Sequence, residues 1–527
     1  MKGSKGLTGV KYLLLAFFAF SVFLPLIRML AHMAGIDIRA LLASGQFLNA
    51  LKNSLVVTTV STLISVALAA ALAWLVERSG IRFKGFFTLL FTLPMLIPSI
   101  SHGMGLVVLF GANGILTNWL GLKGSVYGFW GIVTGSVIYS FPVAFLMLSD
   151  ILRYEDSTPY EAAEVLGIPR GWQFTSITVP YLRRPLTSTV FAIFTLIIID
   201  YGVPLMIGGQ YRTLPVMMYQ DVIGLLDFGK GSAIGLVLLT PAVIAFLLDV
   251  LNRDRGIQSF VSKPFRITRN RVRDGLAYLL SALVSLGVAL PIGAFLLLTL
   301  VRKYPADMRL SLDNVRRTFQ MSAGANLGHS LLIALFTSLT GLVLTFAAAY
   351  LTARSRGRLS KLLHLASLTS LAIPGIVLGL SYVLFFKGSL IYGTLAILIL
   401  VNLVHFFASP YLMIYNTLSK INQHLEAAGQ TLGVSRFSVI RDVIIPQTAG
   451  TLGEMFTYFF VNSMMTISAV AFLATAGTRP LSLMITSFEA QMMLECAAFI
   501  ALLILTVNLV VRGLFAWNKK RIGRGMA

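Results

Sequence analysis

Long apolar segments recur along the whole chain, and they restrict its fold more than any other feature of the sequence. A segment of roughly 20 apolar residues crosses the hydrocarbon core of a bilayer, and about twelve such segments occur among the 527 residues. The segments are continuous rather than alternating, which favours helices over the strands of a closed barrel. We therefore predict an all-α polytopic membrane protein with about twelve transmembrane helices. The predicted spans are 11–31, 53–75, 86–110, 127–150, 186–207, 233–251, 276–300, 329–352, 362–385, 392–416, 449–473 and 494–515.

The composition agrees with a lipid environment. Hydrophobic residues make up 57% of the chain and charged residues 12%, whereas soluble domains carry about 25% charged residues. The formal net charge is +22, but the basic residues gather at the ends of apolar segments and form no basic stripe on a soluble domain. We therefore expect the lipid bilayer as a partner and no nucleic acid.

The distribution of Lys and Arg predicts the orientation of the spans. Cytoplasmic loops of membrane proteins are enriched in these residues. Placing the N-terminus in the cytoplasm puts most of the 42 Lys and Arg residues, and also the C-terminus, on the cytoplasmic side. The loop 302–317 is the exception, because its basic residues fall outside. No small-residue cleavage site follows the first apolar segment, so we expect it to be a retained span.

The two halves of the sequence resemble each other. The segment that begins NSLVVTTVSTL at Asn53 parallels HSLLIALFTSL at His329, and IPSISHGMG at Ile97 parallels IPGIVLGLS at Ile373. Each half has an even number of predicted spans, so both halves have the same orientation, and a pathway is expected at their interface. The predicted domains are a first half at 1–252, a basic cytoplasmic linker at 253–275 and a second half at 276–527.

A polar stretch occurs once in each half, between the fourth and fifth predicted spans. Residues 161–180 read EAAEVLGIPRGWQFTSITVP, and residues 426–446 read EAAGQTLGVSRFSVIRDVIIP. Each copy predicts a short helix that ends at a Gly, followed by a Pro before the next span. Two such helices on the cytoplasmic face predict docking elements for a dimeric or tandem soluble partner. Unpartnered surface helices are the alternative, but two matching copies disfavour it.

This pattern resembles the EAA motif of permease subunits of binding-protein-dependent ABC importers, in the fused form that serves ferric iron, thiamine, phosphonates or polyamines. The resemblance covers nearly the whole chain and implies the type I ABC permease fold, with EAA loops at 154–185 and 418–448. In the second copy Glu426 lies seven rather than six residues before Gly433, so Ala427 takes the usual Glu position. The resemblance implies that ATPase coupling involves Glu161, Ala162, Ala163, Gly167, Pro180, Glu426, Ala427, Ala428, Gly433 and Pro446.

The resemblance also implies partners and a location. A cytoplasmic ABC ATPase homodimer would bind both loops and use ATP and Mg²⁺, while this chain would bind no cofactor. An extracytoplasmic binding protein would deliver the substrate. The chain would lie in a bacterial or archaeal cytoplasmic membrane, with several spans and both termini in the cytoplasm.

The sequence predicts no nucleotide-hydrolysing site in this chain. The stretch Gly224–Gly231 resembles a phosphate-binding loop, but Gly231 replaces the required hydroxyl residue, and the predicted location is external. We therefore expect the chain not to be an enzyme and ATP hydrolysis to reside on a separate subunit.

Polar residues within or beside spans are candidates for the substrate pathway, because burying them in a membrane is costly. Asp200 could meet a cation or a gate residue, or it could pair with an Arg or cap a helix. His102, beside Pro98, could contact an anion or simply pack between helices. The remaining candidates lie on the eleventh span and could also be packing residues. They are Ser463, Thr466 and Ser468. No metal-ligand spacing is present, so no metal site is predicted.

Two other classes of function are open to a chain of this pattern. A proton-coupled secondary transporter with twelve spans would need membrane carboxylates or a proton relay, and Asp200 is the clear candidate. A membrane enzyme would need clustered catalytic side chains at the interface with water, and no such cluster stands out in the sequence.

Overall fold

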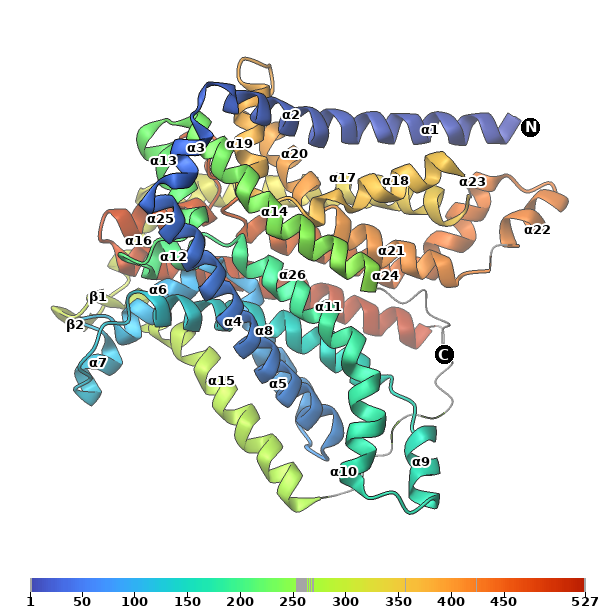
Figure 1. Cartoon of the computed structure of the whole chain (residues 1–527), viewed down its shortest axis with the longest axis horizontal. Coiled ribbons are helices and arrows are strands. Elements are labelled where there is room, and N and C mark those ends of the chain that lie inside the picture. The colour runs from blue at the N-terminus through green and yellow to red at the C-terminus, as the bar shows by residue number, and fades with distance from the viewer. Residues whose placement is uncertain are drawn as a thin grey trace. The chain divides into compact units, whose positions relative to one another are not determined.

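The computed structural model describes residues 2–252, 263, 265, 267, 270–355, 357–422 and 424–525, and most of these residues are helical (Figure 1). Nine of the described helices are long and apolar enough to cross a membrane, or eleven if each of two bent pairs is one span. The predicted all-α membrane class is therefore confirmed. The predicted number was twelve. Two of the predicted spans, 362–385 and 392–416, are bent helix pairs, and the helix of a third, Ile445–Met465, is not among those that qualify.

The helices pack into two compact units. The first-half unit comprises Arg39–Gln220 and Thr240–Asn314, and the second-half unit comprises Met1–Ile38, Asp221–Leu239 and Val315–Ala527. Four helices have residues in both units, namely α3 (Ile38–Ala43), α13 (Leu214–Leu225), α14 (Phe228–Asn252) and α16 (Asp313–Gln320).

The first-half unit is organised around one long helix. Helix α4 (Gly45–Arg78) packs most extensively against α8 (Phe129–Arg153), and also against α11 (Val179–Ile198) and α15 (Arg271–Leu300). Its remaining elements are α5 (Lys84–Thr92), η3 (Leu93–Leu96), α6 (Ser99–Phe110), α7 (Ile115–Leu120), α9 (Thr158–Val165), α10 (Arg170–Gln173), η4 (Phe174–Thr178), α12 (Gly202–Ile207), β1 (Val301–Lys303) and β2 (Asp307–Leu310).

The second-half unit repeats this plan. Helix α17 (Ala323–Ala353) takes the place of α4 and packs against α20 (Leu395–His405), α21 (Ala408–Lys420) and α24 (Ile445–Met465). Its remaining elements are α1 (Lys2–Phe18), η1 (Ala19–Phe23), α2 (Leu24–Ala31), η2 (His32–Gly35), α18 (Arg358–Leu368), η5 (Thr369–Leu371), α19 (Gly375–Phe386), α22 (Leu425–Thr431), α23 (Arg436–Val439), η6 (Ile440–Ile444), α25 (Ser482–Ala490) and α26 (Leu494–Gly525).

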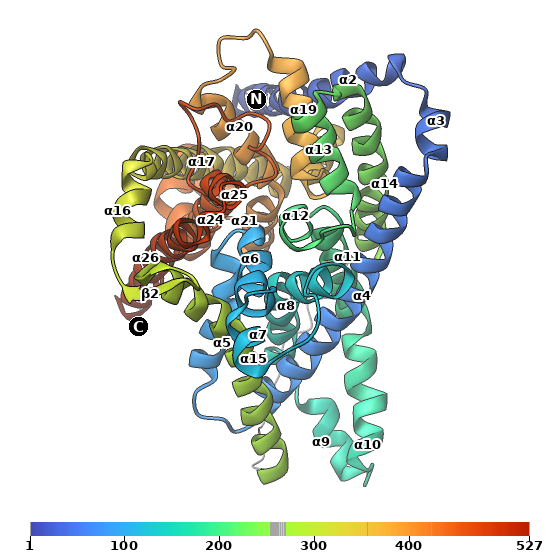
Figure 2. The ribbon, with the colours of Figure 1, turned by 90° about the vertical axis from the view of Figure 1, so that its left-hand side faces the viewer.

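The first span of each half packs in the unit of the other half. Helix α1 lies along α17 and α18, and α2 packs against α19 (Figure 1). Helix α15 packs against α4, α5 and α6 (Figure 2). The predicted domains, 1–252 and 276–527, follow the sequence repeat. The units of packing differ from them, because the two halves exchange their first spans and Asp221–Leu239 also belongs to the second-half unit. Most of the predicted linker, 253–275, lies outside the described residues.

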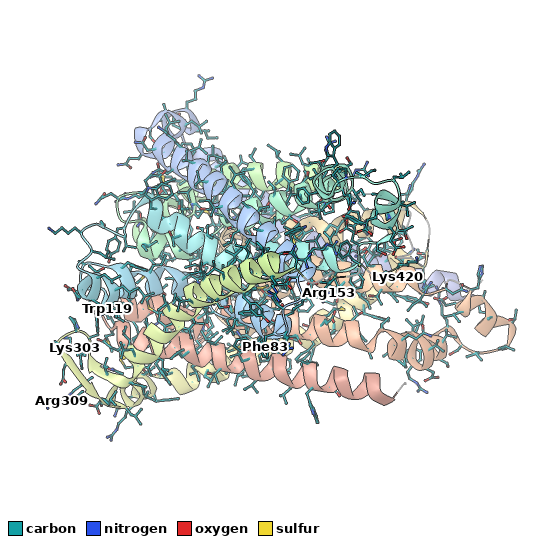
Figure 3. The ribbon with its side chains drawn as sticks, turned by 90° about the horizontal axis from the view of Figure 1, so that it is seen from below. Phe83, Trp119, Arg153, Lys303, Arg309 and Lys420 are labelled. Carbon is teal, nitrogen blue, oxygen red and sulfur yellow. The ribbon has the colours of Figure 1, made fainter. Side chains whose placement is uncertain are left out.

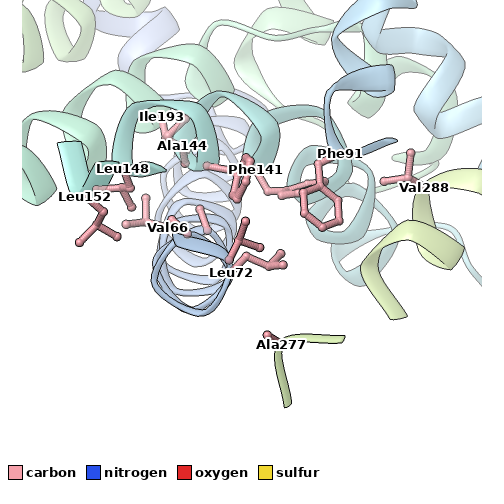
Figure 4. Packing of buried hydrophobic residues seen from close by; sticks show 14 of the residues in the cluster. Val66, Leu72, Phe91, Phe141, Ala144, Leu148, Leu152, Ile193, Ala277 and Val288 are labelled. Carbon is pink, nitrogen blue, oxygen red and sulfur yellow. The ribbon is translucent and has the colours of Figure 1, made fainter. Parts of the chain in front are cut away.

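Small residues let the central helices approach closely. Ser61, Ser65, Ala69 and Ala73 recur every fourth position of α4 and are fully buried, and Ser65 Oγ lies 2.7 Å from Ser140 Oγ of α8. Lipid is as apolar as Leu, so such close van der Waals contact is what favours helix association in a membrane. A cluster of buried hydrophobic residues surrounds this contact, and Figure 4 shows Val66, Leu72, Phe91, Phe141, Ala144, Leu148, Leu152, Ile193, Ala277 and Val288 of this cluster.

The third span of each half is broken at a Pro. Pro98 separates η3 from α6, and Pro374 separates η5 from α19 with a bend of 107°. Pro disfavours helical geometry for the residue before it, which explains why both breaks fall at the repeated Ile-Pro. These breaks place the N-termini of α6 and α19 inside their units.

The loop that departed from the charge pattern forms a short antiparallel hairpin of β1 and β2. Lys303 and Arg309 lie on this hairpin (Figure 3), and Arg302 is within 3.8 Å of both Asp307 and Asp313.

Candidate coupling loops and pathway residues

The first EAA loop (154–185) presents its acidic residue at the surface. Glu161 lies in the first turn of α9, where its Oε1 accepts a hydrogen bond from Ser157 Oγ at 3.0 Å. Its Oε2 pairs with Lys263 Nζ at 3.0 Å, and the Glu161 side chain is 42% exposed. Ala162 is exposed and Ala163 is buried. Glu161 and Ala162 are thus accessible, while Ala163 anchors the inner face.

The second EAA loop (418–448) turns its acidic residue inward. Glu426 of α22 is 6% exposed, Ala427 and Ala428 are exposed, and Gly429 is buried. Counted back from the Gly that ends each helix, Ala427 corresponds to Glu161. One residue of displacement turns a side chain by about 100° around a helix, which accounts for the inward direction of Glu426.

Both short helices end in the same hydrogen-bonded motif. Gly167 has φ +67° and Gly433 has φ +73°. In the first loop the Gly167 N–H donates to Glu164 O at 3.0 Å, and the Ile168 N–H donates to Ala163 O at 2.9 Å. The same two bonds recur at Gly433 and the residue after it. This is the Schellman ending, in which a left-handed residue satisfies carbonyls at the helix terminus, and it explains why both copies carry Gly.

The tips of both helices expose large apolar side chains. Val165 is 88% exposed, Leu166 75% and Leu432 79%. Leu166 and Leu432 occupy the same place, directly before the Gly that ends their helix. None of these three lies within a helix that qualifies as a membrane span among the described residues. Exposed apolar groups outside the bilayer are typical of a surface that another protein covers.

The Pro residues of the motif do not interrupt the chain as the sequence predicted. Pro180 and Pro446 each follow a π-helical turn, η4 or η6, and the helix continues through them into α11 or α24. A wider turn accommodates a residue without an N–H, because the carbonyl four residues earlier no longer needs that donor. Pro180 and Pro446 therefore mark a widened turn within one helix rather than a new start.

Each loop has a buried ion pair at its base, and of the four residues that form these pairs only Glu426 was among the predicted site residues. Arg78 at the end of α4 pairs with Glu155, and Tyr160 Oη donates a hydrogen bond to Glu155 Oε1 at 2.6 Å. Burial raises the pKa of the Tyr160 phenol, which keeps this donor protonated. Arg354 after α17 pairs with Glu426 at 3.1 Å. Arg78 and Arg354 occupy matching positions in the sequence repeat, and this match was the signal by which the ion pairs could have been found.

The pathway candidate Asp200 serves as a helix cap. Its carboxylate accepts hydrogen bonds from the N–H groups of Gly202 at 3.3 Å and Val203 at 3.1 Å, at the start of α12, and from the Ser99 hydroxyl. The sequence allowed Asp200 to meet a cation or a gate residue, to pair with an Arg or to cap a helix, and the structure shows the helix cap.

The other pathway candidates are buried among helices. His102 is 1% exposed, its ring centroid is 5.8 Å from that of Tyr139, and no partner for its Nε2 exists among the described residues. Ser463 and Thr466 are buried, and the Thr466 carbonyl accepts a hydrogen bond from Ser482 Oγ. Ser468 lies against Gly375 at the start of α19. The structure places Asp200 and His102 in one unit and the three hydroxyl residues in the other.

The stretch that resembled a phosphate loop is a helix corner. Gly224 lies in α13, and Gly231 lies in α14, which begins at Phe228. Lys230 pairs with Asp221 at 3.1 Å, and a Cβ on Gly231 would overlap Val222. The glycine is explained by tight packing at this corner.

Two matching sets of broken membrane helices, each with a capped surface helix, define a membrane transport permease. The sequence model of the binding-protein-dependent transport system inner membrane components matches residues 64–255 and 341–524. The chain belongs to this family.

Individual relatives extend the comparison. The chain is 25% identical over 509 residues to the ferric transport system permease protein FbpB of Actinobacillus pleuropneumoniae, covering 91% of this chain and 73% of the relative. It is 24% identical over 432 residues to the thiamine transport system permease protein ThiP of Brucella abortus, covering 78% and 76%. It is 29% identical to the molybdate/tungstate permease protein WtpB of Methanocaldococcus jannaschii, covering 45% and 92%. A solved bacterial alginate ABC transporter, in complex with a periplasmic protein, is 18% identical with a TM-score of 0.40, covering 48% and 95%.

Proposed function

We propose that this ABC importer permease is driven by a separate ATPase dimer that docks on its two EAA loops at the cytoplasmic face. One observation carries the proposal: Leu166 and Leu432 expose the same apolar tip at the same place of the repeat, outside the spans. Exposed apolar side chains at matching helix tips are typical of a surface that a partner covers. Two matching tips fit a partner with two matching grooves.

The connection of each loop to the spans supports a mechanical role. The first EAA loop joins α8 directly to the continuous helix of α10, η4 and α11, and the second joins α21 to the continuous helix of α23, η6 and α24. A force on a tip could therefore act on the span before its loop and on the span after it. ATP-driven closure of the ATPase dimer would rock these spans and alternate access to the pathway.

Ferric iron is the proposed substrate class. The alignment with the ferric permease of Actinobacillus pleuropneumoniae covers 91% of this chain, whereas that with the thiamine permease of Brucella abortus covers 78%. The described residues include no group of three or more His, Cys, Asp or Glu side chains that could hold a metal ion. An extracytoplasmic binding protein would accordingly select the ion, and the permease would pass it on.

Capture of the ATPase tests the docking role. Wild-type chain should retain the co-expressed ATPase subunit on affinity purification. The double variant Gly167→Asp and Gly433→Asp should lose it, because both helix endings need positive φ and both tips would gain charge. Gly124→Asp is the matched control, since this exposed Gly lies in the loop before α8 with open space around it. Equal capture by the double variant would refute docking at these loops.

Transport in vesicles tests the source of energy. Proteoliposomes with the permease, the ATPase and a binding protein loaded with Fe³⁺ should accumulate iron only when ATP is enclosed on the ATPase side. Binding proteins loaded with thiamine or molybdate test the other substrate classes that the relatives suggest. Uphill uptake by the permease alone, driven by a proton gradient, would support the secondary transporter instead.

A further inference from the structure

Two arginines occupy equivalent places at the ends of the central helices, and both are buried. Arg78 is the last residue of α4, and Arg354 directly follows α17. Their side chains are 6% and 2% exposed, and those of their partners Glu155 and Glu426 are 3% and 8% exposed. A buried guanidinium needs a paired carboxylate, since an unpaired buried charge is strongly unfavourable.

The first pair ties the base of α9 to the end of α4. Glu155 precedes α9, and its second contact comes from Tyr160 on that helix. Tyr160 Oη also lies 2.6 Å from Thr178 Oγ1 in η4. The guanidinium of Arg78 stacks over the Phe265 ring, 3.6 Å from its centroid, which completes the enclosure. One ion pair thus joins three segments of the first EAA loop to the central span.

The second ion pair joins the base of α22 to the end of α17, but through different contacts. Arg354 Nη1 donates to the Ile421 carbonyl at 2.9 Å, while its Nε pairs with Glu426. Tyr350 Oη donates to Glu426 Oε1 at 3.3 Å and accepts from Arg436 Nε at 2.8 Å. The end of α21, α22 and α23 are thereby joined to α17.

The carboxylate comes from different places in the two loops. Counted back from Gly167 and Gly433, Ile421 stands where Glu155 stands, and Glu426 stands where Tyr160 stands. The second arginine therefore contacts both equivalent positions, but it takes its charge partner from within the helix. Glu161 stays exposed in the first loop, whereas the exposed Ala427 fills that place in the second.

We propose that Arg78–Glu155 and Arg354–Glu426 are equivalent anchors that fix the two EAA helices to the ends of the central spans. Glu426 is then a positioning residue of the second loop and not a contact of the partner, because its carboxylate faces a buried guanidinium. The two loops offer a partner different surfaces at the same place, namely Glu161 paired with Lys263 in the first loop and the uncharged Ala427 in the second. The identity of that partner rests on the proposed function, but the anchoring does not.

Spin labels at the two tips test the anchors without any ATPase. Leu166→Cys and Leu432→Cys are matched label sites in a Cys496→Ala background, which removes the single native cysteine. In purified permease, Glu426→Gln should raise the mobility of the Leu432 label above that in the same background with Glu426 intact, and it should leave the mobility of the Leu166 label unchanged. Glu155→Gln should have the opposite pattern. If Glu426→Gln leaves the mobility of the Leu432 label unchanged, the proposal is overturned.

Rescue separates positioning from general stability. Glu426→Asp keeps the charge and should leave the mobility of the Leu432 label at its original value. The reversed pair Arg354→Glu with Glu426→Arg should restore that mobility in part. Equal loosening at both tips in Glu426→Gln would indicate general destabilisation and contradict a local anchor.

Capture of the ATPase then distinguishes contact from anchor. Glu161→Gln should weaken capture with both labels unchanged, whereas Glu426→Gln should weaken capture together with loosening of the Leu432 label. If Glu426→Gln weakens capture of the ATPase without raising the mobility of the Leu432 label, Glu426 is a direct contact and this inference is refuted. Failure of wild type to capture the ATPase would refute only the proposed function.

Discussion

Ser99 at the start of α6 lies so close to Gly202 at the start of α12 that a Cβ on residue 202 would overlap the Ser99 hydroxyl. The second half contains the same close approach with the two residue types exchanged, because a Cβ on Gly375 would overlap the Ser468 hydroxyl. Gly375 follows Pro374 as Ser99 follows Pro98. In each half, therefore, one of the two residues at this contact is Gly and the other is Ser. The contact lies where the broken third span meets the segment that follows the fifth span.

This exchange predicts that the contact in the second half can be repaired by a second substitution. Gly375→Ala should lower the free energy of unfolding by about 1–3 kcal/mol, because the new methyl group overpacks the site. Adding Ser468→Gly should recover most of the loss, since Ser468 Oγ is the atom nearest to the new Cβ and the next is His405 Nε2 at 3.0 Å. Thermal unfolding of the purified permease in detergent measures both effects.

The first half provides the control. Gly202→Ala should be destabilising by a similar amount, but Ser99→Gly should not rescue it, because the Ile100 backbone nitrogen would still lie 2.8 Å from the new Cβ. Removing Ser99 also takes a hydrogen bond from Asp200. The overlap is assigned to the Ser468 side chain in the second half and in part to the Ile100 backbone in the first. If Ser99→Gly rescues Gly202→Ala as well as Ser468→Gly rescues Gly375→Ala, this assignment is wrong.

The glycines that end the EAA helices should tolerate Asn better than Ala. Gly433→Ala places a Cβ in the left-handed region, which costs about 1–2 kcal/mol for most residues. Gly433→Asn should cost less, because Asn adopts this conformation more readily. ATPase capture should follow the order Gly, Asn, Ala, and the same order should hold at Gly167.

Gly171 is the internal control for this series. It has open space around it and lies in α10 without positive φ. Gly171→Ala should therefore leave capture unchanged and stabilise the helix slightly. A loss of capture in this control would show that the loop responds to any added methyl group, and the φ argument would fail.

The sequence was sufficient for the class of protein, the repeat and the endings of the surface helices. Periodic apolar segments and Gly at a fixed place depend on local chemistry, so Gly167 and Gly433 could be interpreted without coordinates. The exchange of first spans could not be predicted, because lipid-facing and protein-facing apolar surfaces have the same composition.

The anchors and the cap show a second limit. Arg78 and Arg354 were recognisable as equivalent, but their carboxylates come from different places, so no repeat pattern pairs them. Asp200 carried several readings in sequence, since a carboxylate beside a span can bind, gate or cap. Only the positions of the Gly202 and Val203 N–H groups identified the cap.

The role of Asp200 as a cap predicts that its charge is dispensable. Asp200→Asn keeps an oxygen that can accept hydrogen bonds from the start of α12, so transport should be retained. Asp200→Ala should lose about 1 kcal/mol of stability, as is typical of a lost helix cap. Uptake by proteoliposomes and thermal unfolding check the two variants together. Abolished uptake in a folded Asp200→Asn protein would favour proton coupling through this carboxylate.

The stripe of small residues on α4 should be the part of the first-half unit least tolerant of enlargement. Ser65 is fully buried at 2.7 Å from Ser140 Oγ, so Ser65→Leu would separate α4 from α8. Overpacking of this kind costs about 1–3 kcal/mol, and here the helices have no hydrophobic gain in lipid to offset it. Leu63, two residues away on the same helix, is 60% exposed, so Leu63→Ala should change stability little. Thermal unfolding should therefore rank Ser65→Leu well below Leu63→Ala. The reverse order would mean that α4 presents its other face to α8.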